Sequence, residues 1–232
     1  MSASPLVTVL LPVWNGASLP LTAEGEEPLR VAIRSLARQE AAPDAPVPGF
    51  EVLAVDDGST DGTAALLDAL ATEYPCLRVL HRPHEGLPGA LNAGLEAARG
   101  ALIARMDADD VCHPQRLALQ AAWMAEHPET GLLATRVHFG GDRETARGFA
   151  HFVDWQNGLL DHEAISRNRF RDTPVSHPSV MFRRELPRLH GGYADGFFAE
   201  DWELWLRWLH AGVSMAKLPR ELLVWNDPPR RA

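Results

Sequence analysis

The chain has 232 residues, of which 46% are hydrophobic and 23% charged, a balance typical of a soluble globular protein with a substantial core. Its formal net charge of −9 argues against a broad nucleic-acid-binding surface, so no nucleic-acid partner is expected. Cys76 and Cys112 offer neither a disulfide framework nor a cysteine-based zinc pattern, which favours a reducing compartment.

Apolar runs and turn residues alternate regularly through the first part of the chain. Strands are predicted where short runs of Val, Leu, Ile and Ala end at Pro, Gly or Asp, and helices where apolar residues recur at helical spacing. The predicted strands are 7–11, 51–55, 77–80 and 101–106, and the helices that follow them are 29–39, 63–74, 88–99 and 114–127. This alternation predicts an α/β fold with a mostly parallel, Rossmann-like sheet flanked by helices.

The pattern changes after about residue 130. The segment 131–139 is strand-like, residues 153–166 include a helical stretch, and 176–182 resembles another strand. A strongly helical, tryptophan-rich segment covers 198–210 and is stopped by Gly212, and 221–225 is a candidate last strand. We therefore expect a smaller mixed half that shares one core with the first half, so that residues 1–232 form a single domain.

Three carboxylates end the fourth predicted strand. Asp107 and Asp109 alternate along an extended chain, so their side chains can enter one space while Ala108 leaves it clear. Two close carboxylates repel each other unless a cation lies beside them, and hard oxygen ligands suit Mg²⁺ or Mn²⁺. The alternative, equally open at this point, is a solvated acidic turn before the next helix.

A second acidic pair, Asp56 and Asp57, ends the second predicted strand. Carboxylates at such a strand end can accept hydrogen bonds from a base or a ribose. The alternative is turn formation and helix capping within Asp57-Gly-Ser-Thr-Asp-Gly62. Because no glycine-rich dinucleotide loop or Walker loop is present, a phosphate ligand would need a metal ion instead.

Glu200 and Asp201 open the tryptophan-rich helix. One of them is a candidate general base, although the helix dipole alone favours an acid in this turn. Positions 202, 205, 206 and 209 form an apolar stripe, which predicts a core role for the tryptophans. His177, within Ser176-His-Pro-Ser179, is expected to be structural or to line a pocket rather than to bind a metal.

The order of these segments is more specific than any one of them. It runs through Pro12-Val-Trp-Asn15, Val55-Asp-Asp-Gly-Ser-Thr-Asp-Gly62, Gly86–Gly94, Arg105-Met-Asp-Ala-Asp-Asp110, His177-Pro-Ser-Val-Met-Phe-Arg183 and Glu200-Asp-Trp-Glu-Leu-Trp-Leu-Arg207. The series resembles the family 2 glycosyltransferases of the GT-A fold over residues 5 to 226. The resemblance implies a nucleotide-sugar-binding half at about 5–130 and an acceptor-side half at about 131–232.

The resemblance also implies an activity, namely inverting transfer of a sugar from a nucleotide-diphosphate donor, most often a UDP-sugar. The acceptor would be a hydroxyl of a carbohydrate or lipid-linked molecule. By position, Pro12, Trp14 and Asn15 would lie beside the nucleotide. Asp57, together with Asp56, would bind the base.

The remaining acids receive roles in the same way. Asp107 would face both the nucleotide and a Mn²⁺ or Mg²⁺ ion, and Asp109 would be the direct metal ligand. Asp201 would be the general base, with Glu200 as its neighbour. The chain departs from the family pattern in its long loops at 18–28 and 41–49. Arg230 and Arg231 are candidates either to close over the diphosphate or to form a frayed tail.

Two other functions compete with this interpretation. Asp107-Ala-Asp-Asp-Val111 resembles the loop of haloacid dehalogenase-type phosphatases, but that loop normally follows the first strand and needs a downstream lysine, and Lys217 is the only one here. A catalytically inactive relative that only binds a nucleotide sugar is the second alternative.

The expected location follows from what the chain lacks. No apolar run reaches the roughly 18 residues of a membrane span. The start of the chain has neither the basic nor the apolar region of a secretion signal. We expect a cytoplasmic protein without a transmembrane segment, and peripheral association with the inner face of the cell membrane stays open.

Overall fold

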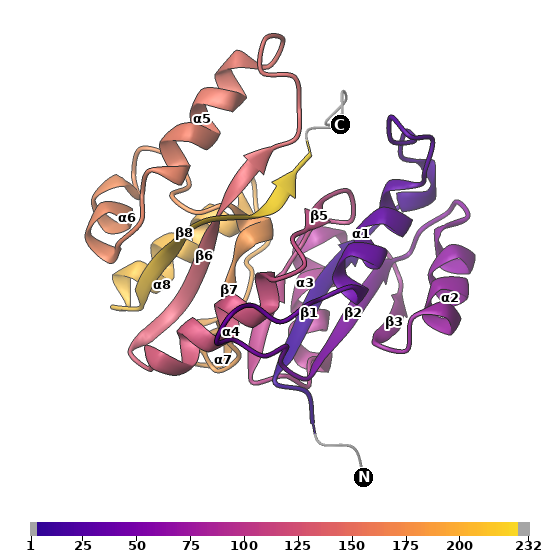
Figure 1. Ribbon diagram of the computed structural model, residues 1–232, viewed down its shortest axis with the longest axis horizontal. Helices are drawn as coiled ribbons and strands as arrows, with labels where there is room; N and C mark the ends of the chain where they lie inside the picture. Colours follow the sequence, from indigo (N-terminus) through magenta and orange to yellow (C-terminus); the bar gives the residue numbers. More distant parts are fainter. Residues whose placement is uncertain (1–3, 227–232) are drawn as a thin grey trace.

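The computed structural model describes residues 4–226, and its strands form one sheet of eight within that range (Figure 1). In spatial order the strands are β3 (Leu77–Arg82), β2 (Phe50–Asp57), β1 (Val7–Val13), β4 (Leu102–Arg105), β7 (Met181–Arg183), β6 (Thr130–Phe139), β8 (Ser214–Trp225) and β5 (Val111–Cys112). The sheet therefore continues without a break from the first half of the chain into the second.

The first half is built as the sequence predicts, except for the short strand β5, which was not expected. Strands β1 to β4 are parallel, and they are connected by helices α1 (Pro28–Ala37), α2 (Thr63–Glu73) and α3 (Gly86–Ala97). Every residue of β1 is buried, because helices cover both faces of a parallel sheet and its central strands are consequently apolar throughout. Helix α4 (Arg116–Glu126) follows the short strand β5. The prediction of an α/β fold with a mostly parallel sheet is confirmed.

The second half differs from the prediction in three places. The predicted strand at 176–182 is a 3₁₀ turn, His177–Ser179, followed by the short strand β7, because Pro178 has no N–H for a strand ladder. The helical stretch at 153–166 is two helices, α5 (Arg147–Asn157) and α6 (His162–Asn168), which are separated at Gly158. The last strand is longer than predicted, because β8 begins at Ser214 and pairs in parallel with β6 through irregular register.

Helix α8 (Glu200–His210) packs its tryptophans into the core. Trp205 and Trp208 are fully buried, together with Leu204. The stripe predicted at 202, 205, 206 and 209 is thus rotated, since Trp202, Leu206 and Leu209 are only partly buried. The core role predicted for the tryptophans is nevertheless correct for two of the three. Helix α7 (Leu186–His190) precedes α8. Within residues 4–226, no helix has both the length and the apolar character needed to cross a bilayer.

Candidate active site

Two adjoining hollows lie at the carboxyl ends of the parallel strands. The larger one has a volume of about 310 Å³ and is lined by Leu87, Arg105, Asp107, Asp109, His177, Pro178, Glu200, Asp201, Trp225 and Asn226. The smaller one has a volume of about 160 Å³ and is lined by Pro12, Val13, Trp14, Asp57, His84, Leu87, Ala90 and Asp107. Leu87 and Asp107 border both hollows and therefore lie where the two meet.

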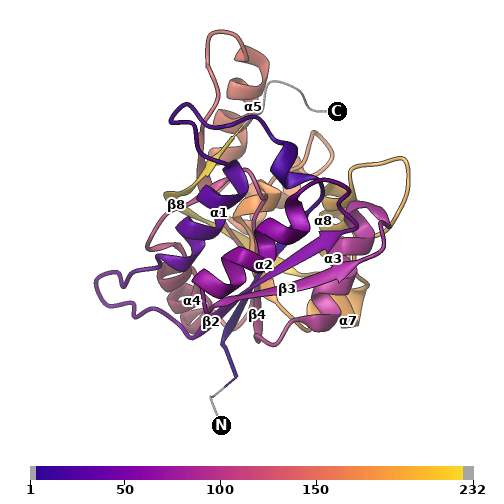
Figure 2. The same cartoon turned by 90° about the vertical axis from the view of Figure 1, so that its right-hand side faces the viewer.

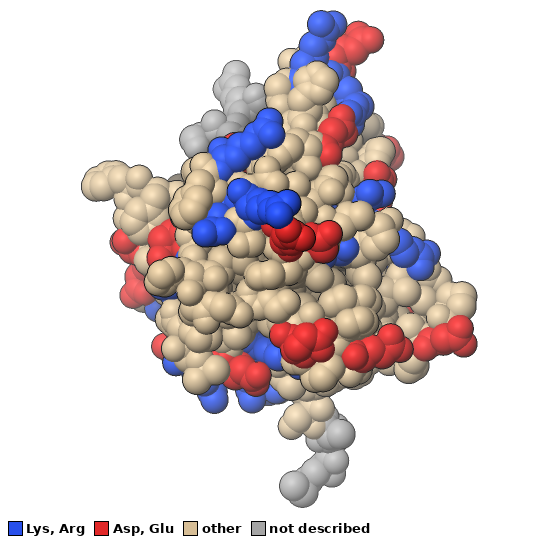
Figure 3. All heavy atoms as spheres, turned by 90° about the vertical axis from the view of Figure 1, so that its left-hand side faces the viewer, with Lys and Arg blue, Asp and Glu red and all other residues tan. Residues whose placement is uncertain are grey.

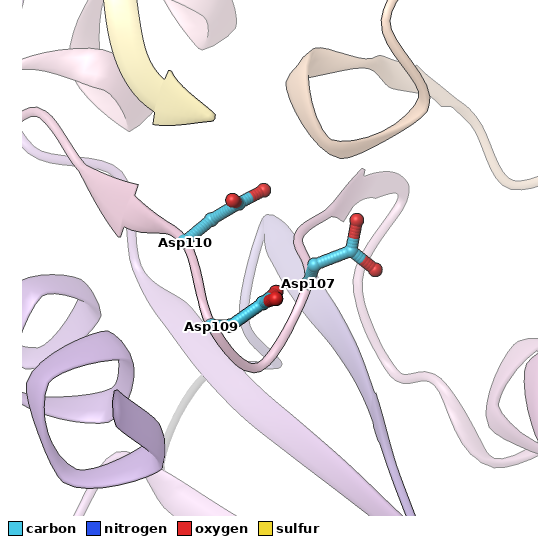
Figure 4. Close-up of side chains that lie close together, drawn as sticks. All are labelled: Asp107, Asp109 and Asp110. Atoms are coloured by element: carbon cyan, nitrogen blue, oxygen red, sulfur yellow. The ribbon is translucent and has the colours of Figure 1, made fainter. Parts of the chain in front are cut away.

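The acidic loop between β4 and β5 forms one wall of this site. The carboxylates of Asp107, Asp109 and Asp110 project from the loop toward the same side, each with an oxygen within 4.8 Å of the others (Figure 4). Asp110 is fully buried, and its Oδ2 has no hydrogen-bond partner among residues 4–226. Burial, followed by the charges of Asp107 and Asp109, raises the pKa of Asp110 well above its usual range. Three hard oxygen donors with an unsatisfied buried oxygen among them suit a divalent cation.

Arg105 and Asn226 hold this loop in place, and the sequence had assigned a role to neither. The Arg105 side chain is buried, and its Nη2 lies 2.5 Å from Asp107 Oδ1. The backbone N of Asn226 donates to Asp110 Oδ1 over 2.9 Å, and its Nδ2 donates to the Asp109 carbonyl over 2.6 Å. The end of β8 is thereby joined to the acidic loop, although more than a hundred residues separate them in the sequence.

The smaller hollow has an aromatic rim. Trp14 is 56% exposed and stacks on His84 with ring centroids 4.9 Å apart. The carboxylate of Asp57 is buried and accepts hydrogen bonds from the backbone N of Glu85 and of Gly86, each over 2.9 Å. Asp57 therefore fixes the start of α3 beside the hollow while it also forms part of the lining.

Asp56 and Asn15 lie behind the smaller hollow and are not among the residues that line it. Asp56 accepts from the backbone N of Ser59 and contacts His81 Nδ1 over 2.8 Å. Burial raises the pKa of Asp56, but these contacts outweigh it and leave the pKa below its ordinary value. Asn15 has a left-handed backbone (φ 50°), and its Oδ1 accepts from Thr60 N. Asn15 thereby joins the loops that follow β1 and β2, whereas Asp56 joins the loop after β2 to β3.

Glu200 and Asp201 form the opposite wall of the larger hollow, in the first turn of α8. The Glu200 carboxylate lies 3.5 Å from His177 Nδ1. Burial raises the pKa of Glu200, but the contact with His177 outweighs it and lowers the pKa below its usual value. The pKa of Asp201 is raised by its burial, with attraction from His177 opposing the rise and the charge of Glu200 adding to it. The two neighbouring carboxyls therefore titrate differently.

A chain of contacts positions His177. Its Nε2 lies 2.9 Å from the Tyr193 hydroxyl, and the Tyr193 backbone is held at both its N and its O by the Asn92 side chain, over 2.9 and 2.8 Å. Asn92 belongs to α3, so the first half of the chain supports the acidic pair of the second. In the sequence we had noted the segment Gly86–Gly94, which contains Asn92, and His177, but no sequence pattern pointed to Tyr193.

The site thus unites most of the residues singled out from the sequence. Pro12, Trp14, Asp57, Asp107, Asp109, Glu200 and Asp201 line the joined hollows, whereas Asn15 and Asp56 support them from behind. His177 also lines the larger hollow. Arg230 and Arg231 lie outside the described residues.

Comparison with known protein families identifies the class of this protein as glycosyltransferase. The chain belongs to glycosyl transferase family 2, whose sequence model matches residues 8–187. It is 30% identical over 227 residues to the amylovoran biosynthesis glycosyltransferase AmsE of Erwinia amylovora, an alignment that covers 94% of this chain and 75% of that protein. It is 28% identical over 188 residues to the UDP-Gal:alpha-D-GlcNAc-diphosphoundecaprenol beta-1,3-galactosyltransferase of Escherichia coli, covering 80% and 64% of the two chains.

Solved structures confirm the predicted GT-A fold. S. aureus TarS in complex with UDP-GlcNAc superposes with a TM-score of 0.73 at 19% identity, covering 97% of this chain and 59% of that one. The mannosyltransferase PcManGT of Pyrobaculum calidifontis, in complex with GDP-Man and Mn²⁺, superposes with a TM-score of 0.72 at 23% identity, covering 99% and 59%. The present chain therefore spans less than two thirds of the length of these chains.

Family membership decides against the phosphatase alternative, and the structure agrees. The acidic loop follows β4 rather than the first strand. Lys217 is buried, and its Nζ donates to the backbone carbonyls of Gln156 and Pro174. It is not among the residues that line either hollow, so it does not face the acidic loop there.

Proposed function

We propose that the protein transfers a sugar from a nucleotide-diphosphate donor, a UDP-sugar, to an acceptor hydroxyl with inversion at the anomeric carbon. The observation that carries the proposal is the shared hollow of about 310 Å³, which Asp107 and Asp109 border from one part of the chain and Glu200 and Asp201 from another. The name of the Escherichia coli relative and the ligand of TarS both favour a uridine nucleotide.

The nucleotide would occupy the smaller hollow. Pro12 and Trp14 line it, and the exposed Trp14 ring offers a flat surface for a base or ribose. Asp57 would accept a hydrogen bond from the base, while Asp56 and Asn15 would act by holding the surrounding loops. A diphosphate that extends from this hollow would reach the acidic loop, because Asp107 borders both spaces.

Asp107 and Asp109 would hold a divalent ion, Mn²⁺ or Mg²⁺, with Asp110 close enough to share the charge. Such an ion, when bound, neutralises the negative charge that grows on the departing diphosphate. The Mn²⁺ of the structural neighbour PcManGT supports this choice of ion. Arg105 would keep Asp107 oriented toward the hollow through its contact with Oδ1.

Asp201 would be the general base. As the acceptor oxygen bonds to the anomeric carbon and the bond to the diphosphate oxygen breaks, the hydroxyl proton passes to the Asp201 carboxylate. The raised pKa makes this carboxylate a better proton acceptor than an ordinary aspartate, whereas Glu200 stays charged beside His177. A single displacement from the face opposite the leaving group gives inversion.

The two halves would work as one domain, because the site draws residues from both of them. The acceptor would be a carbohydrate or a lipid-linked saccharide, as the name of the Escherichia coli relative suggests. We place the reaction in the cytoplasm, at or near the inner face of the cell membrane.

A donor screen tests the proposal. UDP-, GDP- and dTDP-sugars are titrated by calorimetry with and without Mn²⁺, and transfer is then measured on a panel of saccharide acceptors. Metal-dependent binding of one donor followed by transfer is the expected result. Binding without turnover on every acceptor would leave only the inactive, nucleotide-sugar-binding alternative, and absence of nucleotide binding would overturn the proposal altogether.

A further inference from the structure

Three exposed phenylalanines flank the first turn of α8. Phe197 is fully exposed, Phe198 is 50% exposed, and Phe170, just after α6, is 73% exposed. None of the three belongs to the buried core clusters of the described residues. Exposing one large apolar side chain is ordinary, but exposing three aromatic rings around a single helix end calls for a partner.

The three rings lie next to the candidate active site. Phe197 and Phe198 come immediately before Glu200 and Asp201, which line the larger hollow. Trp202, in the same turn, donates from Nε1 to the Arg169 carbonyl over 2.7 Å and so brings the segment that contains Phe170 to this helix end. The loop between α7 and α8 stands away from the body of the molecule, on the side toward which β2 and β3 point (Figure 2). The three phenylalanines therefore belong to the two segments that meet at the start of α8, the helix whose first turn lines the hollow.

Arginines accompany the aromatic rings. The segment Arg167-Asn-Arg-Phe-Arg171 places three arginines within five residues of a chain whose net charge is −9. The Arg169 guanidinium lies over the Phe170 ring, 4.6 Å from its centroid. Arg167 is 76% exposed and pairs with the exposed Glu163, a contact that water screens strongly. Figure 3 shows the face that carries α5 and α6, where blue and red side chains are both scattered over a largely uncharged surface.

We propose that this aromatic and basic rim, consisting of Arg167–Arg171 together with Phe197 and Phe198, docks the protein on an anionic lipid surface. Aromatic rings settle at the boundary between headgroups and acyl chains, and arginines attract anionic headgroups. The mouth of the hollow then faces the membrane, where a lipid-linked acceptor would present its hydroxyl. The orientation of the hollow toward the membrane rests on the proposed function, whereas binding to the lipid surface does not.

The test is sedimentation with vesicles, using the whole chain without any donor or acceptor. The parent protein should bind vesicles that contain phosphatidylglycerol and bind vesicles of phosphatidylcholine alone much more weakly. The double variant F197S/F198S should bind at least about tenfold more weakly, since two rings no longer insert. R167Q and R171Q should each weaken binding by about fivefold at low salt.

The matched controls are L6S and L21S, which remove side chains that are 44% and 61% exposed outside the segments that form the rim. Both should bind vesicles as the parent does, and circular dichroism should show that every variant is folded. The proposal is overturned if the parent does not bind anionic vesicles or if F197S/F198S binds them as well as the parent does. It is equally overturned if the control variants lose as much vesicle affinity as F197S/F198S. It is also overturned if F197S/F198S instead converts a dimer to a monomer, since the rim would then contact a second copy.

The two proposals can fail separately. Calorimetric binding of UDP, measured without vesicles, tests the proposed function alone. Vesicle binding without UDP binding would rule out the proposed transferase function and leave the docking proposal standing. UDP binding without vesicle binding would rule out only the docking proposal.

Discussion

The two walls of the larger hollow carry the same kind of side chain in opposite electrostatic situations. On one wall, Asp107, Asp109 and Asp110 crowd together, and burial with mutual repulsion raises the pKa of Asp110. On the other wall, His177 lowers the pKa of Glu200, while burial raises that of Asp201. The difference shows that the neighbours of a carboxylate decide its chemistry, and it is the basis for proposing a cation site on the first wall and a proton acceptor on the second.

The largest effect is expected when the proposed proton acceptor on the second wall is removed. Asp201→Asn should lower turnover by about 10²–10⁴-fold, the usual contribution of a positioned base, while donor affinity stays within twofold of the parent value. Initial rates at saturating donor and acceptor measure the effect. The control is Glu203→Gln, which lies in the same helical turn but pairs with Arg207 outside the hollow, and which should keep near-normal turnover. Retention of near-normal transfer by Asp201→Asn would show that Asp201 is not the base.

The nucleotide side can be tested at its aromatic rim. Trp14→Ala should weaken UDP binding by about tenfold, because the stacking surface that Trp14 shares with His84 is lost. Trp14→Phe should restore most of the affinity. Because Trp14 is more than half exposed, neither change should alter the melting temperature appreciably. Equal UDP affinity of the parent and Trp14→Ala would place the nucleotide elsewhere.

His177 should set the pH range in which the base works. Attraction from His177 holds down the pKa of Asp201, which burial raises, so His177→Gln should raise that pKa further. A base is active only when deprotonated, so the acidic limb of the rate profile should move to higher pH. Tyr193→Phe, which removes the Nε2 contact but keeps His177 beside Glu200, should shift the limb less. If the acidic limb of the His177→Gln profile does not move, His177 does not influence the pKa of the base.

The smallest predicted effect concerns the stability of the protein after substitution of Asp110. A carboxyl whose pKa is raised by folding holds its proton more tightly in the folded state, so its stabilising contribution is complete at low pH and is lost as the pH rises through the raised pKa. Asp110→Asn removes this loss and should stabilise the metal-free protein at pH 7 by on the order of 1 kcal/mol. Urea unfolding in EDTA measures it.

The control for that measurement is Asp195→Asn, which changes an exposed aspartate and should leave stability unchanged. A metal-free Asp110→Asn protein that is less stable than its parent would contradict the account of the acidic loop. In that case the hydrogen bond from Asn226 to Asp110 would outweigh the repulsion within the cluster.

The sequence predicted those parts of the site that depend on local signals. Apolar runs that end at Asp57 and Asp107 reveal both a strand and the carboxylate at its end, and Glu200 and Asp201 are visible as acids that open an amphipathic helix. The supporting residues depend on tertiary contacts instead. Tyr193 meets Asn92 across 101 residues of sequence, and Asn226 meets Asp109 across 117, so no local pattern could reveal either pair.

The fold shows the same division. The parallel half was predictable because each strand and helix carries its own periodicity. The segment before β7 was not, because Pro178 interrupts an apolar run that otherwise resembles a strand. The start of β8 was missed as well, since Lys217 and Pro219 break the expected alternation and only pairing with β6 makes the segment a strand.

The central claim is that one wall of the hollow holds a cation for the donor while the other faces the acceptor. The most direct measurement is calorimetric titration of UDP into the parent protein, Asp109→Asn and Asp201→Asn, each with and without Mn²⁺. We predict Mn²⁺-dependent binding for the parent and for Asp201→Asn, and none for Asp109→Asn. Equal UDP binding by all three proteins, whether or not Mn²⁺ is present, would contradict the account.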